Sequence, residues 1–225
     1  MPLSDRDYMK PASSPRRIRR PSYLDFSLNP VLAIIIANVI LYIAVAVSAN
    51  GLYPFGSFGR VTIDKFSYYL GLIPYYFASR PWTLFTSMFI HAGFGHIFGN
   101  MITLFFFGSF LHRLIGTKKF LLVYFIGGLV GNALFLLLKL HDLSLVIGAS
   151  GAIYAIAGAL VVMMPKLPVR LYFLIPVPLW VIVLVFYVGW SFLPGVAWQA
   201  HLGGLAVGLI AGYFFRKRIR PNFYR

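Results

Sequence analysis

The stretch VIGASGAIYAIAGALVVMMP, Val146–Pro165, decides how the chain is interpreted. It has the composition of a membrane helix, yet it opens on a serine between small residues, in Gly148-Ala149-Ser150-Gly151. A helix from Ser150 to Met164 is about 22 Å long at about 1.5 Å per residue, whereas the hydrocarbon core of a bilayer is about 30 Å thick. The sequence therefore predicts a helix that begins part-way into the membrane, on a polar residue.

The composition of the whole chain is that of an integral membrane protein. Of its 225 residues, 60% are hydrophobic and 11% are charged, whereas a soluble domain carries about a quarter charged residues. This length provides about six spans of about 20 residues. The chain has no cysteine, which excludes disulfides, thiolate catalysis and cysteine metal sites.

Six apolar segments are predicted to be membrane helices, which makes the fold an all-α polytopic membrane bundle. Their expected ranges are 30–49, 93–114, 120–138, 150–164, 169–190 and 198–215. The fifth is expected to bend at Pro176 and Pro178. Between the first two helices, a long aromatic connection of about 50–90 is interrupted by Gly and Pro, and we expect it to lie partly in the membrane interface.

The charge pattern predicts the orientation of these helices. The net charge is +15, and sixteen of the twenty Lys and Arg residues are cytoplasmic if both termini are cytoplasmic. Residues 1–28 are then a mostly disordered basic tail, 29–215 the membrane domain, and 216–225 a second basic tail. The basic runs flank apolar spans and no nucleic-acid motif is present, so the charge indicates contact with membrane lipids rather than nucleic acid.

Glycines recur every four residues along the last predicted helix, at Gly204, Gly208 and Gly212. Small residues at this spacing allow two helix backbones to approach closely within a membrane. The pattern therefore predicts that the last helix packs tightly against a neighbour.

A few polar residues lie in or beside the predicted helices, where their burial is costly and marks candidates for function. Ser150 lies 15 residues before Pro165, and His201 lies 14 residues before Phe215. Both helices are predicted to run in the same direction, so a rise of about 1.5 Å per residue brings the two side chains to one depth. Histidine is the usual base for a serine nucleophile. The alternatives are a serine N-cap and a structural histidine.

Three further polar residues accompany this pair. His96 and Asn100 are four residues apart and share a helix face, and their N–H donors suit an oxyanion hole, with a structural polar cluster as the alternative. Tyr154 lies one turn after Ser150 and is placed to pack its ring on His201, unless it serves simple aromatic packing. His91 and His96 are five residues apart with no carboxylate nearby, which is wrong for a metal, and we expect no cofactor.

The acidic residues exclude two kinds of catalytic site within the membrane. There is no glutamate, and no aspartate lies within a predicted helix. A site built on a pair of aspartates needs two of them in membrane helices, and a metal site with an HExxH motif needs a glutamate. The loop residue Asp142 lies eight residues before Ser150, which does not place it beside His201. A Ser-His dyad is therefore favoured over a triad.

Three motifs together resemble the rhomboid family of intramembrane serine proteases. GASG, Gly148–Gly151, resembles the family's GxSG motif on the fourth helix. AHLGG, Ala200–Gly204, resembles the base-bearing motif on the sixth, and HAGFGHIFGN, His91–Asn100, resembles the HxxxxHxxxN motif that begins the second. The resemblance covers about residues 30–215 and implies a minimal six-transmembrane-helix rhomboid-like bundle.

The resemblance implies a catalytic set. Ser150 would be the nucleophile and His201 the general base. His96, Asn100 and the backbone N–H of Ser150 would form the oxyanion hole. These residues would surround a water-filled cavity open to the extracytoplasmic side.

The resemblance also implies supporting roles and shows one departure. His91 would position its loop, Gly148 would allow close backbone approach beside the nucleophile, and Tyr154 would support the His201 ring. Many members of the family have an adjacent Trp-Arg pair in the long first connection. Here Trp82 is followed by threonine, and the arginine is Arg80.

The expected function is hydrolysis of peptide bonds in or next to the transmembrane segments of membrane-anchored substrates. One alternative is a catalytically inactive rhomboid-like protein that binds membrane clients, against which the presence of both Ser150 and His201 argues. A second is a small transporter or channel, but the chain has no inverted repeat or intramembrane charge. Because no large soluble domain or organelle-targeting feature is seen, the expected location is a prokaryotic plasma membrane.

Overall fold

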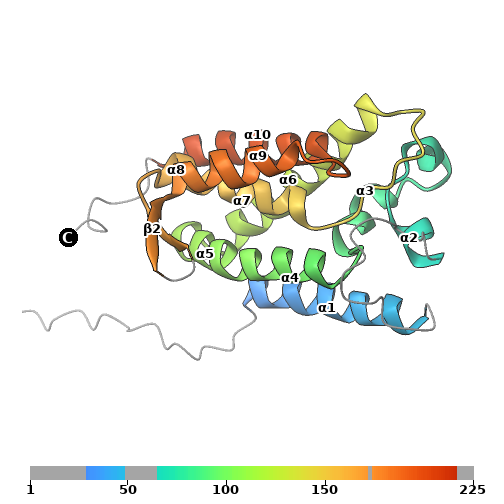
Figure 1. The fold of residues 1–225 in the computed structure, drawn as a ribbon, viewed down its shortest axis with the longest axis horizontal. Coiled ribbons are helices and arrows are strands. Elements are labelled where there is room, and N and C mark those ends of the chain that lie inside the picture. The colour runs from blue at the N-terminus through green and yellow to red at the C-terminus, as the bar shows by residue number, and fades with distance from the viewer. Residues whose placement is uncertain (1–28, 49–64, 172–173, 217–225) are drawn as a thin grey trace, which may run out of the picture.

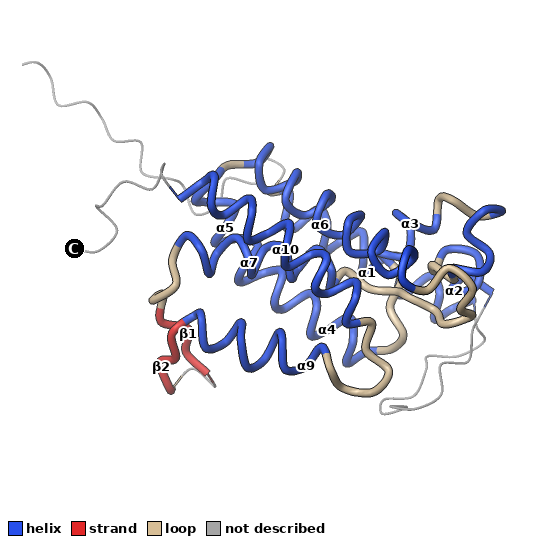
Figure 2. Tube along the Cα trace, turned by 90° about the horizontal axis from the view of Figure 1, so that it is seen from above, coloured by secondary structure: helices blue, strands red, loops and turns tan. Residues whose placement is uncertain are grey.

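The computed structural model describes residues 29–48, 65–171 and 174–216. Its elements are α1 (Pro30–Ser48), α2 (Lys65–Leu70), the 3-10 helix η3 (Pro74–Ser79), α3 (Thr83–Thr86), the 3-10 helix η4 (Ser87–Phe89), α4 (Phe94–Thr103), the π-helix η5 (Leu104–Gly108), α5 (Ser109–Ile115), α6 (Thr117–Leu138), α7 (Ser150–Met163), β1 (Pro168–Leu171), β2 (Ile175–Pro178), α8 (Leu179–Val181), the π-helix η6 (Ile182–Val188), α9 (Gly189–Ser191) and α10 (Trp198–Phe215). The long helices form one bundle, with the hairpin β1–β2 at one end and the short helices α2 and α3 at the other (Figures 1 and 2).

Three helices of the described part are long and apolar enough to cross a membrane. They are α1, the continuous helix α4–η5–α5 and α6, over Pro30–Val47, Phe94–Ile115 and Thr117–Leu138. The interior helix α7 is shorter, with 14 residues from Ser150, and α10 carries Gln199 and His201 in its first turn. The mostly helical membrane fold expected from the sequence is therefore present, and α7 begins on the serine at which it was predicted to begin.

The prediction for the fifth helix, 169–190, was wrong in its first part. Strands β1 and β2 pair antiparallel, with Pro168 opposite Pro178, and the helix begins only at Leu179. Pro176 and Pro178 have no backbone N–H and disfavour a helical conformation in the residue before them, so the chain is extended here rather than bent within a helix. The fold is thus helical with one small hairpin, and not all-α.

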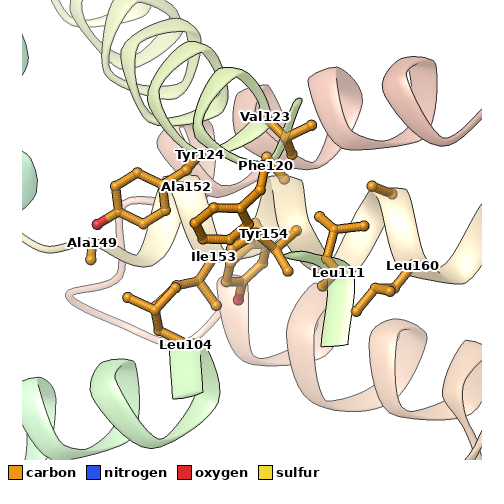
Figure 3. Close-up of a cluster of buried hydrophobic side chains, with 14 of the residues drawn as sticks. Leu104, Leu111, Phe120, Val123, Tyr124, Ala149, Ala152, Ile153, Tyr154 and Leu160 are labelled. Atoms are coloured by element: carbon orange, nitrogen blue, oxygen red, sulfur yellow. The ribbon is translucent and has the colours of Figure 1, made fainter. Parts of the chain in front are cut away.

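Helix α7 lies at the centre of the bundle. Every residue from Gly151 to Leu160 is buried, and α6 and α10 pack along it. Figure 3 shows Leu104, Phe120 and Tyr124 gathered around this helix, and all three side chains are fully buried. A helix that is apolar all round is buried on every side, which is why a segment of this length and composition is stable here.

The glycine stripe of α10 faces the backbone of α7. A methyl group added at Gly204, Gly208 or Gly212 would overlap a backbone carbonyl oxygen on α7. The three carbonyls are those of Gly151, Ala155 and Ala159. Because the numbers rise together by four on both helices, α7 and α10 run parallel in a fixed register, and the close packing predicted from the spacing is observed.

The segment that follows α2 is tied to the end of that helix. The backbone carbonyls of Tyr68, Tyr69 and Leu70 accept side-chain hydrogen bonds. The donors are Arg80, Trp82 and Thr86. The Arg80 guanidinium also lies over the Tyr68 and Tyr76 rings, 4.2 and 4.6 Å from their centroids. The separated arginine and tryptophan of this chain therefore both anchor the connection, although they are not adjacent in sequence.

Gly208→Ala tests the contact between α7 and α10. The added methyl meets the Ala155 carbonyl, which is backbone and cannot move aside, so we expect a loss of about 1–3 kcal/mol in the free energy of unfolding. Thermal denaturation in detergent measures it. Gly99→Ala on α4 is the matched control, because no atom lies within 4 Å of its added methyl. An unchanged melting temperature for Gly208→Ala would contradict the close contact.

Candidate active site

An irregular segment, 139–149, leads from the end of α6 to the start of α7. Val146 of this segment forms an isolated antiparallel bridge with Leu72, which follows α2. The two residues exchange backbone hydrogen bonds with N···O distances of 3.0 and 2.8 Å. Backbone groups away from water need hydrogen-bond partners, and irregular backbone at membrane depth is tolerated only where protein or a water-filled cavity supplies them. The chain after α2 therefore holds the approach to Ser150 in place.

Ser87, at the start of η4, is the second point at which this segment is fixed. Its carbonyl accepts a hydrogen bond from the Gly148 N–H at 2.8 Å. The buried Asn132 of α6 donates from Nδ2 to the Ser87 hydroxyl at 2.9 Å and to the Leu84 carbonyl at 2.8 Å. The chain around Ser87, helix α6 and the segment 139–149 thus meet at Gly148, two residues before Ser150.

Ser150 and His201 meet across the α7–α10 contact. Ser150 is the first residue of α7 and His201 the fourth of α10, and Ser150 Oγ lies 2.8 Å from His201 Nε2. The imidazole is buried, with 7% of His201 exposed, whereas Ser150 is only partly buried. The depth argument from the sequence predicted that these side chains lie at one level, and they are in hydrogen-bond contact.

Two further side chains hold the His201 ring. Tyr154 of α7 stacks on it, with ring centroids 4.0 Å apart and planes 17° apart. On the other ring nitrogen, Nδ1 lies 3.1 Å from the hydroxyl of Ser191, which is fully buried at the end of α9. Ser191 was not among the residues singled out from the sequence, because it lies one position beyond the predicted end of the fifth helix.

His96 and Asn100 face the backbone just before Ser150. A methyl group built on Gly148 would lie 2.7 Å from His96 Nε2 and 3.5 Å from Asn100 Nδ2. His96 Nδ1 accepts a hydrogen bond from the Ala92 N–H at 3.4 Å, which leaves the proton of a neutral imidazole on Nε2. Asn100 Nδ2 is buried without a hydrogen-bond partner in the described part of the chain. Two N–H donors thus converge where an acceptor can be bound.

His91 lies beside this cluster. Its Nε2 accepts a long hydrogen bond, 3.5 Å, from the Ala149 N–H, and its ring meets His96 edge-on with centroids 5.0 Å apart. His91 therefore links the chain before α4 to the chain before α7. Among the residues that the structure describes, no group of three or more His, Cys, Asp or Glu side chains is arranged to hold a metal ion.

Asp142 is engaged in its own turn. Lys139 Nζ lies 2.8 Å from one carboxylate oxygen, and the Ser144 N–H donates to the other at 2.7 Å. The hydrogen bond from Lys139 lowers the pKa of the Asp142 carboxyl to about 2. The group on His201 Nδ1 is a hydroxyl rather than a carboxylate.

The assembled side chains have a definite chemical capacity. A hydroxyl that donates to an imidazole loses its proton as its oxygen attacks an electrophilic carbon. Fixed N–H donors beside that oxygen stabilise the negative charge that then develops on the substrate. The arrangement is therefore competent for acyl transfer from an ester or amide.

Comparison with known families places most of the bundle in one of them. A family model described as "Rhomboid domain" matches residues 78–218. This range covers α3 to α10 and includes Ser150, His201, His96 and Asn100.

Three named relatives agree with this match. "RHOMBOID-like protein 12, mitochondrial" of Arabidopsis thaliana is 31% identical over 210 residues, covering 83% of this chain and 58% of the relative. "Rhomboid-like protease 3" of Toxoplasma gondii is 31% identical over 64% of this chain and 56% of the relative. "Putative rhomboid protease YdcA" of Bacillus subtilis is 39% identical over 34% of this chain and 38% of the relative. The chain thus spans less than three fifths of each relative.

Gly148→Ala tests the packing beside Ser150. Gly148 has φ +123°, and a methyl there meets His96, so we expect the loop to shift and the labelling of Ser150 by a fluorophosphonate probe to fall by about tenfold or more. Gly116→Ala is the control. It has φ +78° with no atom within 4 Å of the added methyl, so it carries backbone strain without the clash and should keep its labelling rate. Equal labelling of both variants would contradict a close approach at Gly148.

Proposed function

This chain belongs to the rhomboid family, and we propose that it is an intramembrane serine endopeptidase. The observation that carries the proposal is the 2.8 Å contact between Ser150 Oγ and His201 Nε2. The two residues come from different helices in the buried centre of a membrane protein, where a hydrogen-bonded polar pair is costly to maintain and marks function.

In the first step, Ser150 is the nucleophile and His201 the general base. Ser150 Oγ forms a bond to the scissile carbonyl carbon while its proton passes to His201 Nε2. The carbonyl oxygen takes up the electron pair and becomes an oxyanion. When the C–N bond breaks, the same nitrogen of His201 gives the proton to the departing amine, and an acyl ester remains on Ser150.

The oxyanion is stabilised by N–H donors that face it. His96 Nε2, Asn100 Nδ2 and the backbone N–H of Ser150 are the proposed donors, with the first residue of α7 contributing the positive end of the helix. The unpartnered state of Asn100 Nδ2 in the described residues supports this assignment, since a buried donor without an acceptor is costly unless a ligand supplies one.

Hydrolysis of the ester completes the cycle. Water gives a proton to His201 Nε2 and its oxygen bonds to the acyl carbon; the bond to Ser150 Oγ then breaks, and Oγ regains the proton. This step needs water at the site. We propose a water-filled cavity open to the extracytoplasmic side, in agreement with the partial burial of Ser150.

The topology that accompanies this mechanism has six membrane-spanning helices and both termini in the cytoplasm. Three of these spans are supported by helices that are long and apolar enough to cross a membrane. The excess of Lys and Arg in the segments placed in the cytoplasm supports the orientation. The membrane domain would extend over 29–215. Residues 1–28 and 217–225 lie outside the described residues, and with them the first basic tail and all of the second, 216–225, except Arg216. Residues 50–64 of the first connection also lie outside them.

The substrates would be membrane proteins cleaved in or next to a transmembrane segment, in contact with membrane lipids. Two of the three named relatives are eukaryotic, one of them mitochondrial by name. The relatives therefore do not support the narrower prediction of a prokaryotic plasma membrane, and the location is that of an integral membrane protein.

Ser150→Ala and His201→Ala should each abolish cleavage of a generic transmembrane substrate by the purified protein in detergent, because each removes one half of the proton-transfer pair. Gel analysis of the product and fluorophosphonate labelling provide two readouts. Persistent cleavage in Ser150→Ala would contradict serine catalysis. Absence of both cleavage and labelling in the unmodified protein would instead favour the alternative, an inactive rhomboid-like protein that binds membrane clients.

Asn100→Ala should slow cleavage by about 100-fold, the usual effect of removing one oxyanion donor. The thermal stability should be preserved, because the amide nitrogen has no protein partner to lose among the described residues. The rate constant at saturating substrate is the measurement. Thr103→Ala, further along the same membrane helix, is the control. It also removes a polar group, a hydroxyl that bonds to the Gly99 carbonyl. An unchanged rate in Asn100→Ala would remove this residue from the oxyanion hole.

A further inference from the structure

The second nitrogen of His201 contacts a helix that carries neither Ser150 nor His201. Nδ1 lies 3.1 Å from Ser191 Oγ at the end of α9, and Ser191 has no exposed surface. A buried hydroxyl between helices in a membrane protein is costly unless its hydrogen-bonding capacity is used. The position of Ser191 therefore calls for a physical reason.

The other contacts of Ser191 indicate the direction of this hydrogen bond. Its hydroxyl donates to the Tyr187 carbonyl at 2.8 Å and also lies 3.0 Å from the Tyr154 hydroxyl. The Tyr154 hydroxyl donates to the same carbonyl at 2.7 Å. Since a serine hydroxyl has one proton and two lone pairs, a proton engaged at either oxygen leaves a lone pair that faces His201 Nδ1.

That direction has a consequence for His201. A lone pair facing Nδ1 is satisfied when Nδ1 carries the proton, and a neutral imidazole then has a bare Nε2. The bare Nε2 is the atom that lies 2.8 Å from Ser150 Oγ. The hydrogen bonds from Ser150 through His201 to Ser191 and Tyr187 then all run in one direction.

We propose that Ser191 is a positioning residue that holds His201 in the tautomer with its proton on Nδ1. Ser191 thus occupies the position beside Nδ1 that an acidic residue takes in a catalytic triad. Its effect on catalysis rests on the proposed function, whereas the tautomer it selects does not. Tyr154 fixes the plane of the ring by stacking, and Ser191 fixes which nitrogen faces the nucleophile.

The tautomer is measured directly by NMR on the purified protein with ¹⁵N-labelled histidine. Two-bond ¹⁵N–¹H correlation spectra distinguish protonation at Nδ1 from protonation at Nε2, and the His201 signals are assigned by their loss in His201→Gln. We expect the Nδ1–H form in the unmodified protein, and a mixture or the Nε2–H form in Ser191→Ala. The Nε2–H form in the unmodified protein, or the same tautomer in both proteins, would overturn the proposal.

Kinetics give a second readout. Ser191→Ala should lower the turnover rate and the fluorophosphonate labelling rate by about tenfold, as expected for loss of one hydrogen bond of ordinary strength, with KM unchanged. Ser191→Thr keeps the hydroxyl and should keep both the tautomer and most of the rate. Ser109→Ala, which removes a half-buried serine on α5, is the matched control and should leave the rate unchanged.

The outcomes separate this proposal from the function on which it builds. If the unmodified protein neither cleaves nor is labelled, the proposed function fails while the NMR spectra still decide the role of Ser191. If the unmodified protein cleaves and Ser191→Ala cleaves equally fast, the catalytic role of Ser191 fails alone. An equal loss of rate in Ser109→Ala would show that removing a serine hydroxyl elsewhere in the bundle has the same effect, which also overturns the proposal.

Discussion

The close parallel contact between α7 and α10 is the constraint on which the site depends. Glycines at 204, 208 and 212 leave room for carbonyls at 151, 155 and 159, so the two backbones approach closely over two turns of each helix. A larger residue at any of these places would separate the helices. Because the register is fixed by this repeat, the first turns of the two helices lie side by side, and the 2.8 Å contact between Ser150 and His201 follows from backbone packing.

A second constraint acts on the chain that enters α7. This helix starts within the protein, so the preceding segment brings backbone N–H and C=O groups to a depth where each needs a partner. The partners are Leu72 and Ser87, from the chain between α1 and α4. Asn132 of α6 holds Ser87 in turn. The first connection, which looks like an irregular insertion in the sequence, is therefore part of the wall that orients Gly148 and the start of α7.

The sequence predicts the parts of the site that depend on helical periodicity. Constant rise per residue brings Ser150 and His201 to one depth, and spacing by four places Tyr154 on the face of Ser150, where its ring does stack on His201. Periodicity does not predict what prolines interrupt. Residues 169–178 are apolar enough to be taken for the start of a helix, but the prolines in the stretch favour the hairpin. Ser191 was missed because it lies one position beyond the predicted end of the fifth helix and because its contact with His201 depends on how α9 packs.

A neutral hydroxyl on the base fits a membrane interior better than a carboxylate does. Burying an aspartate beside His201 would carry a desolvation cost that its attraction to the imidazole need not recover. A serine can orient the same ring without placing a charge there, and its one proton is accepted by the Tyr187 carbonyl or the Tyr154 hydroxyl. The cost is weaker stabilisation of the imidazolium that would form during the proposed acyl transfer, since a hydrogen bond to a neutral acceptor is roughly half as strong as one to an ion. In the proposed mechanism, more of the transition-state stabilisation would then fall on the N–H donors of the oxyanion hole, which gives His96, Asn100 and the close approach at Gly148 their importance beside Ser150 and His201.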